Sequence, residues 1–398
     1  MKRKTDSQKI KEALTRRVEK ILPDREGLKK LIQKTRIRLY LGIDPTGSKL
    51  HLGHTIALRK LQEFSDLGHE AILVVGTGTV LAGDPSARNE TRPRITEKEI
   101  RENMATWKKQ AKKILDFSKV KIQYNGDWLL KLSLKEVIEI ASHISAIKLF
   151  KRDMFQRRLK RGDTVWTHET LYPLLQGYDS VVLDVDLEIG GTDQTFNMLI
   201  GRELQQKMRG REKFILTVPM VLGIDGKQMS KTSGNCIWLT DNPNQMFGKI
   251  MSLPDNLIIT YFDLLTRVPM DLLSQYRKEL GTKKVNPMEL KEKLALEIVK
   301  MYHSEKAAQG AVREFIRIFK EKKLPAKIPI IKVKDRKLNI LDLLIKTKVA
   351  ASRSEAKRLI LQKGVKINGI IQKDWKKDVE TQKGQIIQVG KRKFVRLG

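Results

Sequence analysis

The sequence predicts an α/β fold built on a parallel sheet, followed by a helical region and a small basic module. An apolar run at Leu39, Leu41 and Ile43 is typical of a short strand, and turn residues follow it at 44–48. Residues 55–64 then carry apolar side chains at helical spacing, and a second apolar run covers 70–78. This strand–helix–strand order is typical of parallel sheets. Strand signals stop after residue 235.

The other elements follow in chain order. Residues 1–35 are expected to form helices outside the first strand, and Thr96 with Glu99 matches a capping box that begins a helix running to about residue 117. Helical patterns also cover 133–145 and most of 242–325, and another helix is expected after residue 194, running to about residue 208. Further strands are expected at 121–124, 181–189 and 214–222.

Composition limits the classes of protein. The 398 residues suffice for two or three domains, and no apolar run approaches the roughly 20 residues that span a bilayer, so no membrane partner is expected. The N-terminus lacks an apolar segment, and Cys236 is the only cysteine, which excludes an intramolecular disulfide framework. A cytoplasmic protein is expected. The net charge of +33 favours a polyanionic partner such as nucleic acid, although part of it can be solvated lysine surface.

Two histidines lie at the predicted start of the helix after the first strand. His51 and His54 are three residues apart and therefore share one face, and a helix N-terminus offers N–H donors that suit a phosphate group. Gly53 removes a side chain where something flat lies against the backbone. The alternatives are an ordinary helix face or a pair of metal ligands. No third His or Cys lies nearby in the sequence, so a zinc site is not expected.

A polar loop follows the strand predicted at 214–222. It carries Lys231 between Ser230 and Thr232, so one mobile ammonium lies among hydroxyl groups, and this suits a polyphosphate on which charge develops. Taken alone, such a lysine is usually a solvated surface residue.

Further polar groups stand at predicted strand ends and on one helix face. The segment 83–92 brings Asp84, Arg88 and Arg92 to the end of the second strand, where ligands of open α/β sheets bind; an Asp-Pro turn with surface arginines is the alternative. Tyr172, Gln176 and Asp179 have helical spacing and would line a polar pocket or form an exposed helix edge. The Gly-Gly turn at 190–194 suits a ribose.

Two basic segments remain. Residues 148–161 include seven Lys or Arg and would clamp an RNA backbone or form a solvated helix face. Residues 331–398 contain 19 Lys or Arg and 6 Asp or Glu, a net charge of +13, which is denser than the chain average.

Segments 45–54 and 228–232 together resemble the HIGH and KMSKS signatures of class I aminoacyl-tRNA synthetases. Further blocks at 83–86, 172–179 and 190–194 stand in the expected order, so the chain resembles the bacterial type of the tyrosyl-tRNA synthetase family over nearly its whole length. The resemblance implies four parts: a Rossmann-like catalytic domain at 1–240, a helical anticodon-side domain at 241–325, a linker at 326–336 and a small α+β S-four-like RNA-binding domain at 337–398.

The resemblance also implies roles for individual residues. The substrate phenol hydroxyl would meet Tyr40 and Asp179, its ammonium group would meet Asp84, Tyr172 and Gln176, and Gln194 would lie beside its carboxylate. The catalytic set on the ATP phosphates would be Thr46, His51, His54 and Lys231, with Arg88 and Arg92 on pyrophosphate. ATP would also contact Asp44, Gly53, Met229 and Ser230, and its ribose Gly191 and Asp193. In the C-terminal module Arg353, Lys357 and Arg358 would follow RNA phosphates.

The implied reaction is attack by the tyrosine carboxylate on the ATP α-phosphate, followed by transfer of the tyrosyl group to the 3′ end of tRNA(Tyr). Mg²⁺ is expected with the ATP phosphates and not in a protein-ligated metal site, and family members are homodimers. The sequence departs from the family pattern at two positions. Gln228 stands where the family usually has the first Lys of its second signature, with Lys227 adjacent, and Thr232 replaces the last Ser.

Three alternatives compete with this interpretation. A tryptophanyl-tRNA synthetase shares the fold and both signatures, but indole has no hydroxyl for Asp179. A small-molecule adenylyltransferase shares the paired histidines but does not need the basic C-terminal module. A non-catalytic RNA-binding paralogue is disfavoured because His51, His54 and Lys231 are all present.

Overall fold

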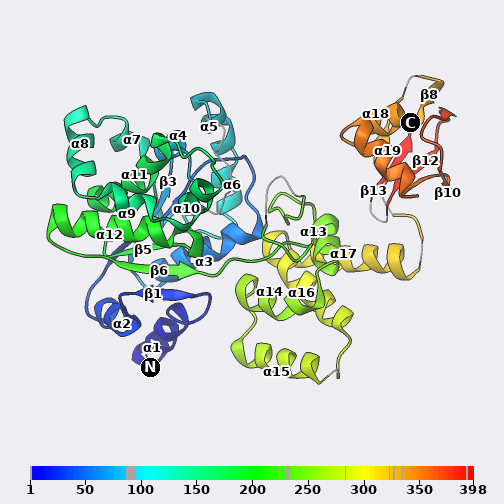
Figure 1. Cartoon of the computed structure of the whole chain (residues 1–398). Coiled ribbons are helices and arrows are strands. Elements are labelled where there is room, and N and C mark those ends of the chain that lie inside the picture. The colour runs from blue at the N-terminus through cyan, green and yellow to red at the C-terminus, as the bar shows by residue number, and fades with distance from the viewer. Residues whose placement is uncertain are drawn as a thin grey trace. The chain divides into compact units, whose positions relative to one another are not determined.

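A computed structural model describes residues 2–86, 95–229, 234–282, 284–321, 323–325, 328–333, 335–390 and 393–398. The chain divides into two compact units, residues 1–305 and 306–398, and each is described by itself. Figure 1 shows the sheet and helices of the first unit and the small β-rich module at the C-terminus. No helix among the described residues is long and apolar enough to cross a membrane.

The first unit is organised around a six-stranded sheet in its described residues. The strand order is β1-β6-β5-β2-β3-β4, and all neighbours are parallel except the edge strand β1, which pairs antiparallel with β6. The central strands are buried on both faces, which is why they are nearly continuous apolar runs in the sequence. The strands are β1 Lys20–Leu22, β2 Arg38–Ile43, β3 Glu70–Val75, β4 Lys121–Tyr124, β5 Leu187–Gly191 and β6 Phe214–Val218.

Helices connect and cover these strands. Helix α3 packs on β2, β3 and β5, while α11 and α12 pack closely on each other. The helices up to the last strand are α1 Lys2–Ala13, α2 Arg25–Lys34, α3 Leu52–Asp66, α4 Thr79–Ala82, α5 Glu97–Met104, α6 Trp107–Ala111, α7 Gly126–Leu129, α8 Leu134–Ser142, α9 Ala146–Phe150, α10 Asp153–Lys160, α11 Thr167–Leu183, the 3-10 turn Thr192–Gln194 and α12 Thr195–Arg209.

The sheet confirms the predicted parallel α/β class and corrects several boundaries. The predicted strand 181–189 is wrong in its first part, because α11 continues to Leu183 and β5 begins at Leu187. The apolar side chains of Val181 and Leu183 are buried where α11 packs, so their hydrophobicity results from a helix and not from a strand. The single helix predicted from 96 to 117 is interrupted between α5 and α6, and the edge strand β1 was not predicted.

A group of helices follows the sheet within the same unit. They are α13 Pro243–Met251, the 3-10 turn Asp255–Leu257, α14 Ile258–Leu265, α15 Met270–Gly281 and α16 Pro287–Tyr302. Helix α14 contacts α3, and the buried Arg17 guanidinium donates from Nε to the Leu264 carbonyl at 2.9 Å. These contacts join the helical group to the sheet. The finer division of this unit at residue 240 stays a prediction.

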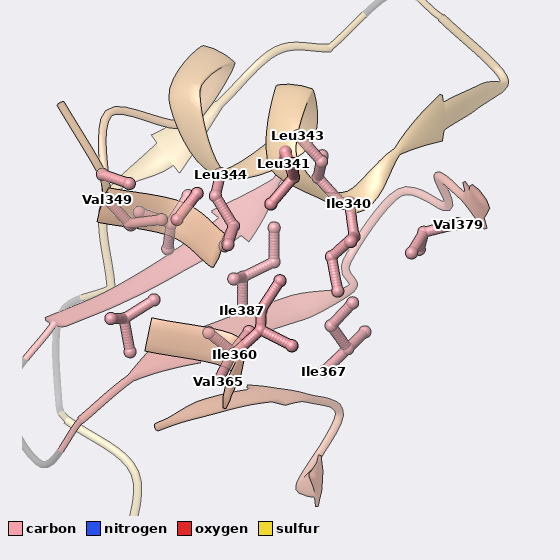
Figure 2. Packing of buried hydrophobic residues seen from close by; sticks show 14 of the residues in the cluster. Ile340, Leu341, Leu343, Leu344, Val349, Ile360, Val365, Ile367, Val379 and Ile387 are labelled. Atoms are coloured by element: carbon pink, nitrogen blue, oxygen red, sulfur yellow. The ribbon is translucent and has the colours of Figure 1, made fainter. Parts of the chain in front are cut away.

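The boundary between the units falls at the first residue of α17 Glu305–Phe315, which continues as one π-helical turn, Ile316–Lys320. The second unit ends in a small α+β module. Its strands form a five-stranded sheet, β10-β9-β12-β13-β7, and a pair, β11-β8. Ile340, Leu344, Ile360 and Ile387 meet in the module's core (Figure 2). The elements are β7 Ile330–Ile331, β8 Lys337–Asn339, α18 Ile340–Lys346, α19 Arg353–Leu361, β9 Val365–Ile367, β10 Ile370–Ile371, β11 Asp378–Glu380, β12 Ile386–Val389 and β13 Lys393–Leu397.

Candidate active site

A cavity of about 630 Å³ opens where β2 and β5 end side by side. From β2 the chain proceeds to β3 on one side, and from β5 to β6 on the other, so this is the point at which the strand order reverses. Ligands of open α/β sheets bind at such a point, outside the carboxyl ends of the strands. We call it the strand-end cavity.

Most of the predicted site residues that the structure describes line this cavity. Its lining includes Asp44, Thr46, His51, Gly53, His54, Asp84, Tyr172, Gln176, Asp179, Gly191, Asp193, Gln194, Gln228 and Met229. Arg88 and Arg92 lie outside the described residues, as do Ser230 and Lys231. The fold therefore brings together residues from five separate segments of the sequence.

The two histidines form a reciprocal cap at the start of α3. His51 Nδ1 accepts from the Gly53 N–H at 3.2 Å, and the His51 N–H donates to His54 Nδ1 at 3.1 Å. Because Nδ1 accepts in both neutral rings, each carries its proton on Nε2 and can donate from that atom. A Cβ at Gly53 would lie 2.9 Å from the His51 ring, so the glycine lets the imidazole of His51 pack against the start of the helix.

A chain of hydrogen bonds lines another part of the cavity. Gln194 Nε2 donates to Asp84 Oδ2 at 2.9 Å, and Asn197 Nδ2 lies 2.9 Å from the side-chain oxygens of both Gln194 and Gln176. The Tyr172 hydroxyl donates to Asp44 Oδ2 at 2.9 Å. These contacts hold carboxylate and amide oxygens in one region, which can accept hydrogen bonds from an ammonium group.

Asp84 has a buried cation beside it. Arg152 Nη2 lies 3.9 Å from Asp84 Oδ1 and donates to the Ser86 hydroxyl. Arg152 belongs to the basic run 148–161, and Arg158 of the same run is buried in an ion pair with Glu169. These two arginines stabilise the fold from inside and are not on a solvated face that RNA could contact.

Asp179 is a buried acid in the cavity lining. Its Oδ2 accepts from Asn125 Nδ2 at 3.0 Å and its Oδ1 from Trp128 Nε1 at 2.9 Å. Burial, only partly offset by these donors, raises the pKa of Asp179 to about 8. Asp193 is also shifted, because burial and the nearby Asp84 raise its pKa. Burial in the cavity wall thus raises the pKa of both carboxyl groups.

Tyr40 is a predicted site residue that lies behind the residues lining the cavity. It is fully buried in β2 and is not part of the cavity lining. Its hydroxyl lies 3.0 Å from Ser180 Oγ and 3.4 Å from the Gln176 carbonyl oxygen. That Tyr40 and Asp179 bind one substrate hydroxyl together stays a prediction.

Several residues near the cavity were not predicted. Asn125 follows directly after β4, and its position at a strand end was an available signal. Glu188 is a charged residue inside the apolar run of β5, which was a second signal. Thr79 and Trp128 lie in stretches with no distinctive pattern. Among the described residues, no group of three or more His, Cys, Asp or Glu is placed to hold a metal ion.

The C-terminal module places its predicted residues on or near helix α19. Arg353 pairs with Asp342, and Lys357 Nζ lies 4.1 Å from the centroid of the Trp375 ring. Arg358 is exposed on the same helix. The module thus presents basic and aromatic groups together, which suits nucleic acid.

The sequence and fold of this chain are similar to those of known proteins. Residues 32–320 match the family model described as tRNA synthetases class I (W and Y), and residues 321–397 match that of the tyrosine–tRNA ligase SYY-like C-terminal domain. The tyrosine–tRNA ligase of Thermotoga maritima is 43% identical over 385 residues, which are 96% of each chain. The chain belongs to the tyrosine–tRNA ligase family.

Other members of the family match over similar lengths. The tyrosine–tRNA ligase of Moorella thermoacetica is 42% identical over 96% of this chain and 94% of its own. Among solved structures, a C-terminally truncated mitochondrial tyrosyl-tRNA synthetase from Aspergillus nidulans matches with a TM-score of 0.66 and 20% identity, over 80% of this chain and 100% of that one. The enzyme from Archaeoglobus fulgidus, solved with L-tyrosine, matches with a TM-score of 0.62 and 22% identity, over 77% and 99%. These structures share the fold.

Proposed function

We propose that the strand-end cavity binds L-tyrosine and ATP together and is the place where tyrosyl-adenylate forms. As a tyrosine–tRNA ligase, the protein activates tyrosine with ATP, releases pyrophosphate and then transfers the tyrosyl group to the 3′ end of tRNA(Tyr). What supports this use of the cavity is that acceptor groups for an amino acid and paired imidazoles at a helix N-terminus line the same space.

The amino acid is assigned to the side of the cavity with carboxylates and amides. Asp84, Tyr172 and Gln176 would meet its ammonium group, and Gln194 would lie beside its carboxylate. Asp179 would meet the phenol hydroxyl. Tyr40 would share that hydroxyl with Asp179, and Asn125 and Trp128 keep the Asp179 carboxyl in place.

ATP is assigned to the start of α3 and the strand ends beside it. The Nε2–H groups of His51 and His54 would donate to phosphate oxygens, with Thr46, Gly53 and Asp44 nearby, while Gly191 and Asp193 would hold the ribose. Met229 lines the cavity directly before Ser230 and Lys231, which we assign to the phosphates together with Arg88 and Arg92. These segments correspond to the HIGH and KMSKS signatures.

The chemistry needs little from the protein besides placement and charge. The tyrosine carboxylate is already a nucleophile, so catalysis consists of aligning it with the α-phosphate and stabilising the charge that develops on the phosphates. Magnesium would enter with ATP as a counterion of the polyphosphate.

The tRNA would be bound in part by the C-terminal module, which we assign as S-four-like. Arg353, Lys357 and Arg358 would follow phosphates. We also propose a homodimer. Three large apolar residues of α8 and α9 are exposed, Leu134 by 76%, Ile138 by 60% and Ile147 by 71%, and a partner subunit would cover them.

The test is amino-acid-dependent ATP–pyrophosphate exchange without tRNA, with tyrosine, phenylalanine and tryptophan compared. We expect exchange with tyrosine alone, and we expect the K231A variant to lose it while K227A retains it. Exchange with tryptophan alone would overturn the assignment of Asp179. No exchange with any of the three would contradict the proposed use of the cavity and would identify Gln228 as a disabling difference from the family.

A further inference from the structure

A lysine and a glutamate form a fully buried ion pair beneath the strand-end cavity. Lys213, directly before β6, contacts Glu188 of β5 and the Ser180 hydroxyl of α11 through its Nζ. Both side chains are at most 2% exposed. Burying two charges costs several kcal/mol per ion, and an apolar pair of similar volume is often at least as stable, so packing alone does not explain the pair.

The fold makes room for this lysine at one point. A Cβ at Gly201 would lie 2.6 Å from Lys213 Nζ, so the ammonium occupies the space that a larger residue in α12 would fill. Gly177 of α11 lies across from Gly201, and a Cβ there would be 3.0 Å from the Gly201 Cα. The ammonium therefore reaches the crossing of α11 and α12, directly behind the helix that carries Gln176 and Asp179.

Glu188 carries the effect of the lysine to the cavity. Its side chain is part of the cavity lining, and its Oε1 accepts from Gln176 Nε2 at 3.0 Å. An ionised carboxylate can only accept, so it determines that the NH₂ end of the Gln176 amide faces β5. The other end, Oε1, accepts from Asn197 Nδ2 at 2.9 Å and keeps a second lone pair. The orientation of the amide is thus set at both ends.

Lys213 is the buried partner that holds the Glu188 carboxylate in place. Burial lowers the pKa of Lys213, but the Glu188 carboxylate opposes that shift. Without the cation, the Glu188 side chain would lose its buried ion-pair partner, and its hydrogen bond with the Gln176 amide would no longer be held in one geometry.

We propose that the Lys213–Glu188 pair is a positioning device that holds the Gln176 carboxamide with its oxygen available to the α-ammonium group of the amino-acid substrate. Neither residue touches the substrate ammonium itself. The inference rests on the proposed function, in which Gln176 binds that group.

The test compares K213M, E188Q and the double variant K213M/E188Q in the full-length enzyme. K207M is the matched control, because Lys207 is an exposed lysine of α12 that pairs with Glu203. Pyrophosphate exchange gives KM for L-tyrosine and for ATP. Inhibition by 3-(4-hydroxyphenyl)propionate, which has the phenol and the carboxylate but no ammonium group, reports the rest of the pocket.

For K213M we expect KM for tyrosine to rise roughly tenfold or more, as for loss of one charge-assisted contact, while KM for ATP and the inhibition constant of the propionate change by less than about twofold. The double variant should recover most of the tyrosine affinity, because the carboxamide oxygen that E188Q introduces can still accept from Gln176 without carrying a charge. K207M should resemble the wild type.

Several results would overturn the inference. A folded K213M with unchanged KM for tyrosine would do so. An equal loss of affinity for tyrosine and for the propionate would assign the pair a purely structural role. If K213M does not fold, the same comparison in E188Q and the double variant decides the question. A wild-type protein without tyrosine-dependent exchange would contradict the proposed function itself, which separates the two failures.

Discussion

Trp128 donates a hydrogen bond from its indole Nε1 to Oδ1 of Asp179 over 2.9 Å, and so links the short helix α7 to the long helix α11. Asn125 donates to the other carboxyl oxygen. Two fixed donors therefore orient a buried acid toward the cavity. A phenol hydroxyl can donate to the carboxylate or accept from the carboxylic acid, whereas phenylalanine offers neither.

The variant D179N should lose discrimination between tyrosine and phenylalanine. An amide at this position would bring its NH₂ against one of the two fixed donors and so misplace the group that meets the hydroxyl. We expect kcat/KM for tyrosine in pyrophosphate exchange to fall roughly 100-fold, with a change below about threefold for phenylalanine. D127N, which replaces an exposed carboxylate of α7, is the control. An unchanged ratio in D179N would remove Asp179 from hydroxyl recognition.

The stability of the unliganded enzyme should depend on the ionisation of Asp179. Burial raises the pKa of this group from 3.8 to about 8, so between these values the folded state holds a proton that the unfolded state has released. The free energy of unfolding therefore falls as pH rises through this window, by up to about 1.4 kcal/mol per pH unit from this group. Above pH 8 the contribution levels off.

Thermal unfolding of wild type and D179N from pH 5 to pH 9 measures this effect. The Tm of the wild type should fall relative to that of D179N between pH 5 and 8 and then run parallel to it. Parallel curves over the whole range would show that Asp179 titrates normally in the folded protein.

The exposed apolar side chains of α8 and α9 should mediate self-association. Replacing Ile138 and Ile147 by glutamate places two charges on this surface without disturbing the core, because both side chains point to solvent. Sedimentation at micromolar concentration should show a dimer for the wild type and a 45.8-kDa monomer for the double variant. M270E, which changes an exposed residue on α15, should remain dimeric. A monomeric wild type would contradict the prediction.

Lys357 and Arg358 should contribute to tRNA affinity and leave amino-acid activation untouched. We expect their double replacement by alanine to raise KM for tRNA about tenfold and to weaken its salt dependence, since fewer phosphates would be neutralised. Pyrophosphate exchange should not change. K346A is the control, because Lys346 pairs with Asp335 in the same module. Unchanged tRNA kinetics would place the RNA contact elsewhere.

Local patterns predicted much of the fold and most of the cavity lining. The alternation of apolar runs and helical spacing gave the parallel α/β class, and strand-end positions pointed to Asp84, Gly191 and Asp193. The predicted strand boundaries were wrong where an apolar run belonged to a buried helix. Val181 and Leu183 are apolar because a helix buries them, and a run of this length does not distinguish strand from helix.

By itself the sequence determined the class of fold, the order of its motifs and the chemistry of the groups that line the site, because these follow from residue type and spacing. Only the tertiary structure decided which of those groups share a space. Tyr40 is fully buried in β2 with its hydroxyl 3.0 Å from Ser180 Oγ, and Gly201 of α12 leaves the space that the Lys213 ammonium occupies beside Glu188. Such contacts join residues that are distant along the chain, and their distances arise when helices pack on the sheet.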